Sequence, residues 1–165
     1  MNIVLIILII LIIYVYSYYR YPTKVLILQS LPDQFKPEML LERQPIVIEN
    51  NASSLKDLKN VFFKWSPSHD FNISGSDKWH YNKYKYIALQ LENDGEILLC
   101  PPRTKMIIDD ITGLDIPDPD DANLLAIQAK KREIVIIPFH WRYLIDVKLD
   151  VACLGIHDYI TYFLP

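Results

Sequence analysis

The sequence predicts a mostly β domain that follows an N-terminal transmembrane helix. An uncharged apolar run extends from Ile3 to Tyr19. After it, short β-branched and aromatic runs alternate with turn-forming residues such as Asn93-Asp94-Gly95. The remaining length of roughly 140 residues suits one domain with a single core. We therefore divide the chain into a signal-anchor at residues 1–21 and a β domain at residues 22–165.

The apolar run has the properties of a membrane anchor, which makes a lipid bilayer the first expected partner. Eleven consecutive Ile, Val and Leu residues give it an insertion free energy of roughly −4 to −7 kcal/mol. Tyrosines at its end predict an aromatic belt at the membrane surface. The predicted anchor residues are Ile3, Leu5, Leu8, Leu11, Ile13, Tyr14, Tyr16, Tyr18 and Tyr19.

Basic residues predict the orientation of this anchor. Arg20, Lys24 and Lys36 follow the run, whereas no basic side chain precedes it. The positive-inside rule then places the body in the cytosol, as a single-pass membrane protein. A cleaved signal peptide lacks its basic region here, and a buried core helix is disfavoured because all faces are equally apolar. A lumenal, lectin-like domain stays as an alternative, which glycan attachment at Asn51 or Asn72 would reveal.

Charge and cysteine content exclude further classes of protein. The net charge is −3 and no long Lys or Arg cluster occurs, which argues against nucleic acid as a partner. Cys100 and Cys153 both lie in apolar, strand-like runs, so we expect buried free thiols. No P-loop, G-x-S-x-G, Cys-x-x-Cys or H-E-x-x-H motif is present, so hydrolase, nucleotide-binding and zinc functions lack their starting residues.

The β-branched and aromatic runs predict ten strands, and their spacing is typical of a sandwich or barrel. Two short segments with a capping residue ahead of them predict helices, at 33–41 and 53–59. The expected strands are 25–29, 45–49, 60–65, 84–91, 96–100, 105–108, 124–129, 133–139, 142–147 and 151–163.

Two long stretches carry a resemblance to a known family. The first runs without a gap from His80-Tyr-Asn through Asp94-Gly95 to Cys100-Pro-Pro102. The second runs from Arg132 through Ile137-Pro-Phe-His-Trp141 to Ile145. Together with Pro45-Ile-Val-Ile48 and Asp115-Ile-Pro-Asp118, they resemble the JmjC family, especially its asparaginyl-hydroxylase branch. The resemblance implies a cupin-like double-stranded β-helix, or jelly roll.

The resemblance also implies an iron site whose ligands have been replaced. Family members bind Fe(II) through a His-x-Asp pair and one distant His. His80 keeps the first position, but Asn82 stands where the carboxylate belongs and Tyr143 where the distal histidine belongs. A neutral amide is a poor ligand for a dication, and a phenol must lose a proton to bind well. We therefore expect no metal, no cofactor and no catalytic residue.

The co-substrate positions of the family differ as well. The lysine that clamps 2-oxoglutarate corresponds to Gly95, and a hydroxyl-bearing residue ahead of the metal histidine corresponds to Asp77, which would repel the same dicarboxylate. Of the other histidines, His140 alternates away from Tyr143 along one strand, and His157 is expected to be a hydrogen-bonded core or surface residue. The acidic loop 115–121 lacks the glycine and glutamate of a calcium loop.

These observations predict a degenerate, non-catalytic interaction protein. Candidate contact aromatics are Trp65, Trp79, Tyr84 and Trp141, although strand spacing is equally consistent with core positions. The abundance of Ile, Tyr, Asn and Lys suggests AT-rich coding, as in large DNA viruses with an internal membrane. Capsid or virion membrane proteins are then the expected partners, for a minor capsid protein between the inner virion membrane and the shell. A membrane-anchored Fe(II)/2-oxoglutarate hydroxylase is the alternative.

Overall fold

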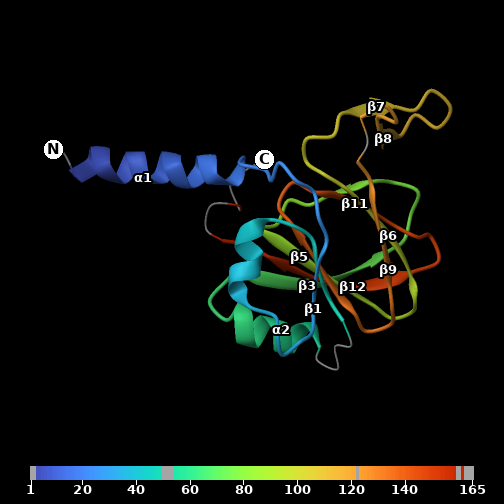
Figure 1. Cartoon of the computed structure of the whole chain (residues 1–165), viewed down its shortest axis with the longest axis horizontal. Helices are drawn as coiled ribbons and strands as arrows, with labels where there is room; N and C mark the ends of the chain where they lie inside the picture. The colour runs from blue at the N-terminus through green and yellow to red at the C-terminus, as the bar shows by residue number, and fades with distance from the viewer. Residues whose placement is uncertain (1–2, 50–53, 122, 159–160, 162–165) are drawn as a thin grey trace.

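The computed structural model describes residues 3–49, 54–121, 123–158 and 161, and it shows one long helix that projects from a body of β strands (Figure 1). Two further helical segments lie on the body. The helical segments are α1 (Ile3–Tyr18), the 3₁₀ helix η1 (Pro37–Glu42) and α2 (Leu55–Phe62). The strands are β1 (Leu28–Ser30), β2 (Ile46–Ile48), β3 (Ser68–Ser74), β4 (His80–Tyr81), β5 (Tyr86–Leu91), β6 (Gly95–Cys100), β7 (Met106–Ile108), β8 (Asp115–Pro117), β9 (Leu125–Ala129), β10 (Ile134–Pro138), β11 (Arg142–Ile145) and β12 (Asp150–Ile156).

The strands form open sheets. A six-stranded sheet has the order β1-β2-β10-β5-β12-β3, a four-stranded sheet has the order β4-β11-β6-β9, and β7 pairs with β8. Strands β1 and β2 run parallel, and the other paired strands run antiparallel. Within the described residues no strand pairing joins one sheet to another, so the sheets do not close on themselves.

The central strands of the six-stranded sheet are buried on both faces. On β10, Val135 and Ile137 belong to the core between the two large sheets, whereas Ile134 and Ile136 face η1 and α2. Successive side chains of a strand point to opposite faces, so a strand with two covered faces needs an unbroken apolar run. This requirement explains why all five residues of β10 are buried.

The mostly β prediction agrees with this architecture, but several predicted elements differ. The predicted strand at 60–65 is wrong: most of it lies in or just after α2, because Leu55, Leu58 and Phe62 share one helix face against the core. Ser54 begins this helix with a capping box to Asp57. Strands β3 and β8 were not predicted, since their sequences are polar or rich in proline and aspartate. Cys100 and Cys153 are free and buried, as expected.

The predicted transmembrane anchor is wrong. Helix α1 has 16 residues, which at 1.5 Å per residue is about 24 Å, against a hydrocarbon core of about 30 Å. In the part of the chain that the structure describes, no helix combines the length and the apolar character that a membrane crossing requires. The predicted fold class and the single-pass membrane localisation are corrected accordingly.

The C-terminal end of helix α1 docks onto the body. The hydroxyl of Tyr14 donates to the carboxylate of Asp158 at 2.6 Å, and the hydroxyl of Tyr18 donates to the same oxygen. Lys85 forms an ion pair with this carboxylate at 3.3 Å, and the ring of Tyr18 packs edge-on against Phe139. Tyrosines expected in an aromatic belt are instead part of this contact, which we call the tyrosine clasp.

Tyr18→Ala should release helix α1 from the body. Tyr18 is 4% exposed, and loss of a buried aromatic side chain costs about 3 kcal/mol. The undocked population should rise at least ~10-fold, and trypsin should cleave after the exposed Arg20 faster by a similar factor. Tyr16→Ala is the matched control, because Tyr16 is 71% exposed. Equal cleavage rates for the two variants would show that the clasp does not hold the helix.

Candidate functional site

Two of the three positions that correspond to metal ligands in the resembled family, His80 and Tyr143, face each other in the four-stranded sheet. His80 on β4 lies directly opposite Tyr143 on β11. Their rings stack, with centroids 5.3 Å apart and planes inclined by 20°. The Nε2 atom of His80 lies 3.3 Å from the Ser76 hydroxyl. The structure therefore brings together two of the three residues that the sequence analysis singled out, but as a stacked pair of rings.

The third position, Asn82, is a structural hydrogen-bonding residue. It is 1% exposed. Its amide nitrogen donates to the carbonyl oxygens of Ile137 and Pro138, at 2.9 and 2.8 Å. Its amide oxygen accepts from the backbone N–H of Tyr84 at 3.0 Å. Both N–H donors and the amide oxygen are engaged, so this side chain joins the loop after β4 to the end of β10.

Burial favours the uncharged forms of both residues of the stacked pair. Burial lowers the pKa of the His80 imidazole below its usual value. Burial also raises the pKa of the Tyr143 phenol far above its usual value of 10.0, and the neighbouring Cys153 and Tyr84 add to this effect. The Cys153 thiol is likewise kept protonated, because burial raises its pKa to about 12. A phenol in this environment does not supply the phenolate that metal binding requires.

The two co-substrate positions offer no anion site. Asp77 is exposed, and its carboxylate would repel a dicarboxylate. Gly95 at the start of β6 packs against Leu149, and a Cβ atom there would lie 2.2 Å from a Leu149 methyl carbon. A lysine at this position would therefore have to displace a buried leucine side chain. Among the described residues, no group of three or more His, Cys, Asp and Glu side chains could hold a metal ion.

The candidate contact aromatics separate into surface and core residues. Trp65 is 88% exposed, and the Lys64 ammonium lies 5.5 Å from its ring centre. Trp79 and Tyr84 are half-buried. Trp141 is 1% exposed and belongs to the core between the sheets, so the interpretation of Trp141 as a contact residue is corrected. Trp141 lies just before β11, whose residues Tyr143 and Ile145 belong to the same core.

Two ring clusters were not predicted from the sequence. His69, on the unpredicted strand β3, donates to or accepts from the Tyr84 hydroxyl at 3.0 Å and stacks on His157 with ring centroids 5.9 Å apart. His140 forms a second cluster on the other side of β4, where its ring lies against Tyr81 and its Nδ1 contacts the Tyr21 hydroxyl. The sequence held one signal for the separation of these clusters. Neighbouring residues of a strand point to opposite faces, so Tyr81 and His80 on β4 were expected on different sides.

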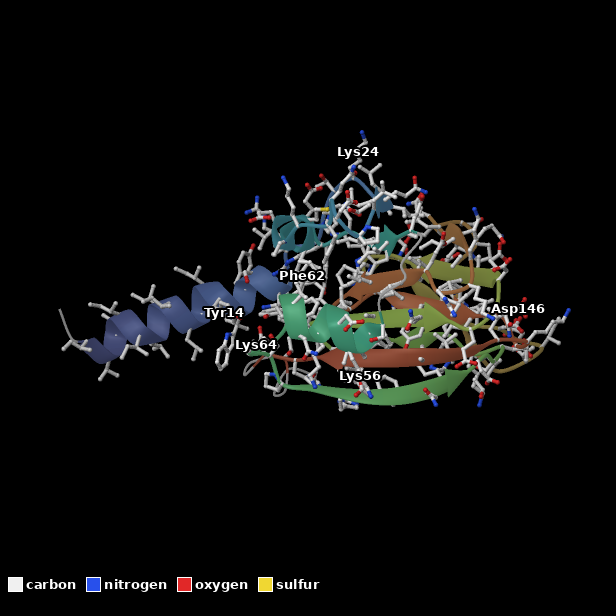
Figure 2. The ribbon with its side chains drawn as sticks, turned by 90° about the horizontal axis from the view of Figure 1, so that it is seen from below. Tyr14, Lys24, Lys56, Phe62, Lys64 and Asp146 are labelled. Atoms are coloured by element: carbon white, nitrogen blue, oxygen red, sulfur yellow. The ribbon has the colours of Figure 1, made fainter. Side chains whose placement is uncertain are left out.

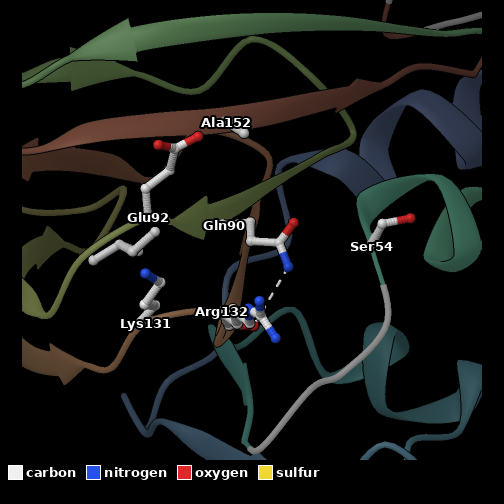
Figure 3. A pocket seen from close by; sticks show the side chains of 7 residues that line it. Ser54, Gln90, Glu92, Lys131, Arg132 and Ala152 are labelled. Atoms are coloured by element: carbon white, nitrogen blue, oxygen red, sulfur yellow. Dashed lines mark hydrogen bonds between the residues drawn. The ribbon is translucent and has the colours of Figure 1, made fainter.

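A surface hollow lies at the far end of β5 from the His80–Tyr143 pair. It has a volume of about 360 Å³ and is lined by Ser54, Gln90, Leu91, Glu92, Lys131, Arg132 and Ala152 (Figure 3). The side chain of Gln90 donates to the carbonyl oxygen of Arg132 across it, at 3.4 Å. The hollow carries charges of both signs and includes none of His80, Asn82 and Tyr143, so it is a separate surface feature.

The chain was also compared with known proteins. It matches no protein-family model and no curated protein. The JmjC-like assignment therefore depends on the residues of this chain alone.

Asn82→Asp, which introduces the carboxylate that the family resemblance implies, should destabilise the fold. A carboxylate cannot donate to the Ile137 and Pro138 carbonyls, and a buried unpaired charge beside two carbonyl oxygens costs about 3 kcal/mol or more. Urea denaturation measures this loss of unfolding free energy. Asn72→Asp is the control, because Asn72 is exposed on β3 and should change stability by less than about 0.5 kcal/mol. Similar losses for both variants would contradict the structural role of Asn82.

The free energy of unfolding should fall as the pH drops from about 7.5 to about 5. The folded-state pKa of His80 lies below the unfolded value of about 6.5, so the unfolded state binds more protons in this range and is favoured there. His80→Gln should lessen this pH dependence. Adding His157→Gln in the same chain should lessen it further, because burial lowers the pKa of His157 too. Denaturation midpoints across the pH range test this, and an unchanged slope in His80→Gln would refute it.

Proposed function

We propose that this chain is a non-catalytic interaction protein built on a degenerate JmjC-like domain. The hydrogen bonding of Asn82 is the observation that carries this proposal. At the position where the family has a metal-binding carboxylate, this chain has an amide whose donors are bound to backbone carbonyls. The position has a structural role that a carboxylate could not fill.

The placement of the other two positions supports the family resemblance. In the resemblance, one ligand-bearing segment contains His80 and the other contains Tyr143. These segments are neighbouring strands, paired in register at these two residues. The strands align the two positions, and burial favours the uncharged form of both side chains. Both features support a scaffold of the family that no longer binds iron.

Exposed aromatic and aliphatic side chains supply the contact surface in this proposal. Trp65, at 88% exposure, gives a large rigid contact area at low entropic cost. The finer form of the proposal is a minor capsid protein that contacts other virion proteins. Its support is the richness of the chain in Ile, Tyr, Asn and Lys, which AT-rich coding produces.

Metal content and 2-oxoglutarate turnover test the proposal. The full chain, incubated with Fe(II), ascorbate and 2-oxoglutarate, should retain far less than one iron per chain and form no succinate above the level without protein. The double variant Asn82→Asp/Tyr143→His should behave in the same way, because its carboxylate would project toward the β10 carbonyls.

A catalytically active JmjC-family hydroxylase under the same conditions is the positive control for this assay. Stoichiometric iron with succinate formation by the unaltered chain would overturn the proposal and establish the hydroxylase alternative. Activity in the double variant alone would show that only the ligands, and not the scaffold, had been lost.

A further inference from the structure

The segment between β6 and β9 forms an arm that stands apart from the two large sheets. Within the described residues, β7 and β8 pair with each other and with no strand of those sheets, and they project from the body (Figure 1). We call residues 105–121 the acidic arm. Two isoleucines near its tip are open to solvent, with exposed fractions of 68% at Ile108 and 93% at Ile111. The arm thus presents a small apolar surface away from the body.

Hydrogen bonds hold this arm in one shape from its base to its tip. At the base, the backbone N–H of Asp118 donates to the Lys105 carbonyl at 2.9 Å, and the two side chains form an ion pair at 3.6 Å. At the tip, the Gly113 N–H donates to the Asp109 carbonyl at 2.8 Å, and the Thr112 N–H donates to the Asp109 carboxylate at 3.0 Å. Gly113 has a φ of 67°, which closes the turn. The tip is therefore ordered before any partner binds, which lowers the entropic cost of a contact made there.

The arm also concentrates the negative charge of the chain. It contains six aspartates and one lysine, which give it a net charge of −5, whereas the whole chain has a net charge of −3. The residues outside the arm therefore carry +2 together. Asp110 precedes Ile111 in the chain, and Asp115 lies directly opposite Ile108 in the β7–β8 pair. Both aspartates are exposed, so each isoleucine has a carboxylate beside it.

We propose that the acidic arm docks into an apolar pocket of another protein, and that the rim of this pocket carries lysine and arginine side chains. Ile108 and Ile111 enter the pocket, while Asp110 and Asp115 pair with the basic rim. Charge complementarity selects this partner, because a net charge of −5 repels nucleic acid and anionic lipid head groups. The same charge speeds the encounter with a basic surface.

A second copy of this chain suits the arm less well. Its apolar groove lies beside α2, on the side of the body that faces the viewer in Figure 2. The groove is lined by Pro32, Phe35, Ile48, Asp57, Leu58, Val61 and Phe62. The charged side chain in this lining is a carboxylate, which would repel the aspartates of the arm. The partner is therefore a different protein with a rim of the opposite charge.

This inference deepens the proposed interaction function, on which it rests, by naming a contact element and the chemistry of its partner. Its test uses the full chain with the photoreactive residue p-benzoylphenylalanine in place of Ile111, and in a second variant in place of Trp65. Each variant is irradiated in an extract of the cells that produce the chain, and cross-linked proteins are identified by mass spectrometry. The protein captured at position 111 is then purified, and its direct binding to the unaltered chain is measured.

A contact of this size belongs to the small interfaces, so we expect a dissociation constant on the order of micromolar. Ile111→Ser should weaken binding at least ~10-fold, because it removes a central apolar side chain. Val61→Ser is the matched control and should change binding less than ~2-fold. Val61 is 70% exposed on α2, on the side of the body turned away from the arm (Figures 1 and 2).

The dependence on salt tests the charge of the partner. Raising the NaCl concentration from about 50 to about 500 mM should weaken binding of the unaltered chain, because salt screens the attraction between the arm and the basic rim. The double variant Asp110→Asn/Asp115→Asn should bind more weakly at low salt and lose most of this dependence. Binding that does not change with salt would overturn the proposal.

Other results would overturn it as well. These are a cross-link from position 111 to a second copy of the chain or to lipid, an equal loss of binding for Ile111→Ser and Val61→Ser, and no cross-link at position 111. Cross-links at position 65 without any at position 111 would refute the acidic arm and leave the proposed interaction function standing. The absence of cross-links at both positions would count against both proposals.

Discussion

The burial of β10, β5 and β12 on both faces is the constraint on which the rest of the structure depends. Their outward and inward side chains complete two different cores, one under the four-stranded sheet and one under η1 and α2. Neither covering layer can be lost without exposing half of an apolar strand to water. Gly155 on β12 shows how close the packing is, since a Cβ atom there would lie 2.6 Å from a Tyr84 ring carbon.

The hydrogen bonding of Asn82 follows from the way this central sheet ends. Strand β10 finishes at Pro138, two residues past the last one that pairs with β2, and buried carbonyls at this end need hydrogen-bond donors. The Asn82 amide provides two donors in one side chain. The same residue accepts from Tyr84 just ahead of β5, so the loop between β4 and β5 is fixed to the sheet end. This arrangement also holds His80, two residues earlier, in register with Tyr143.

The sequence predicted the central strands because double burial leaves a local signal, the unbroken run Ile134–Pro138. It missed β3 because Ser68–Ser74 alternates polar residues with only Phe71 and Ile73 facing the core. The transmembrane prediction failed because helix α1 has only 16 residues. The tyrosine clasp could not be predicted either, because it joins residues 140 apart in the sequence and no local pattern reports such a contact. The residue types at positions 80, 82 and 143 could be compared with the family pattern from the sequence, but the structural role of Asn82 required its hydrogen-bond partners.

Position 82 has a structural role in this fold, because the Asn82 amide donates to two backbone carbonyls. This role determines whether a carboxylate could stand at that position. A position that had only lost its carboxylate would tolerate its return, because a bound cation would neutralise the charge. At position 82 the carboxylate would instead face two carbonyl oxygens of β10, each a partial negative charge that repels it. A bound cation would offset this repulsion only if the side chain turned toward His80, and both carbonyls would then lose the Asn82 donors. The hydrogen bonds of Asn82 therefore favour an amide over a carboxylate at position 82.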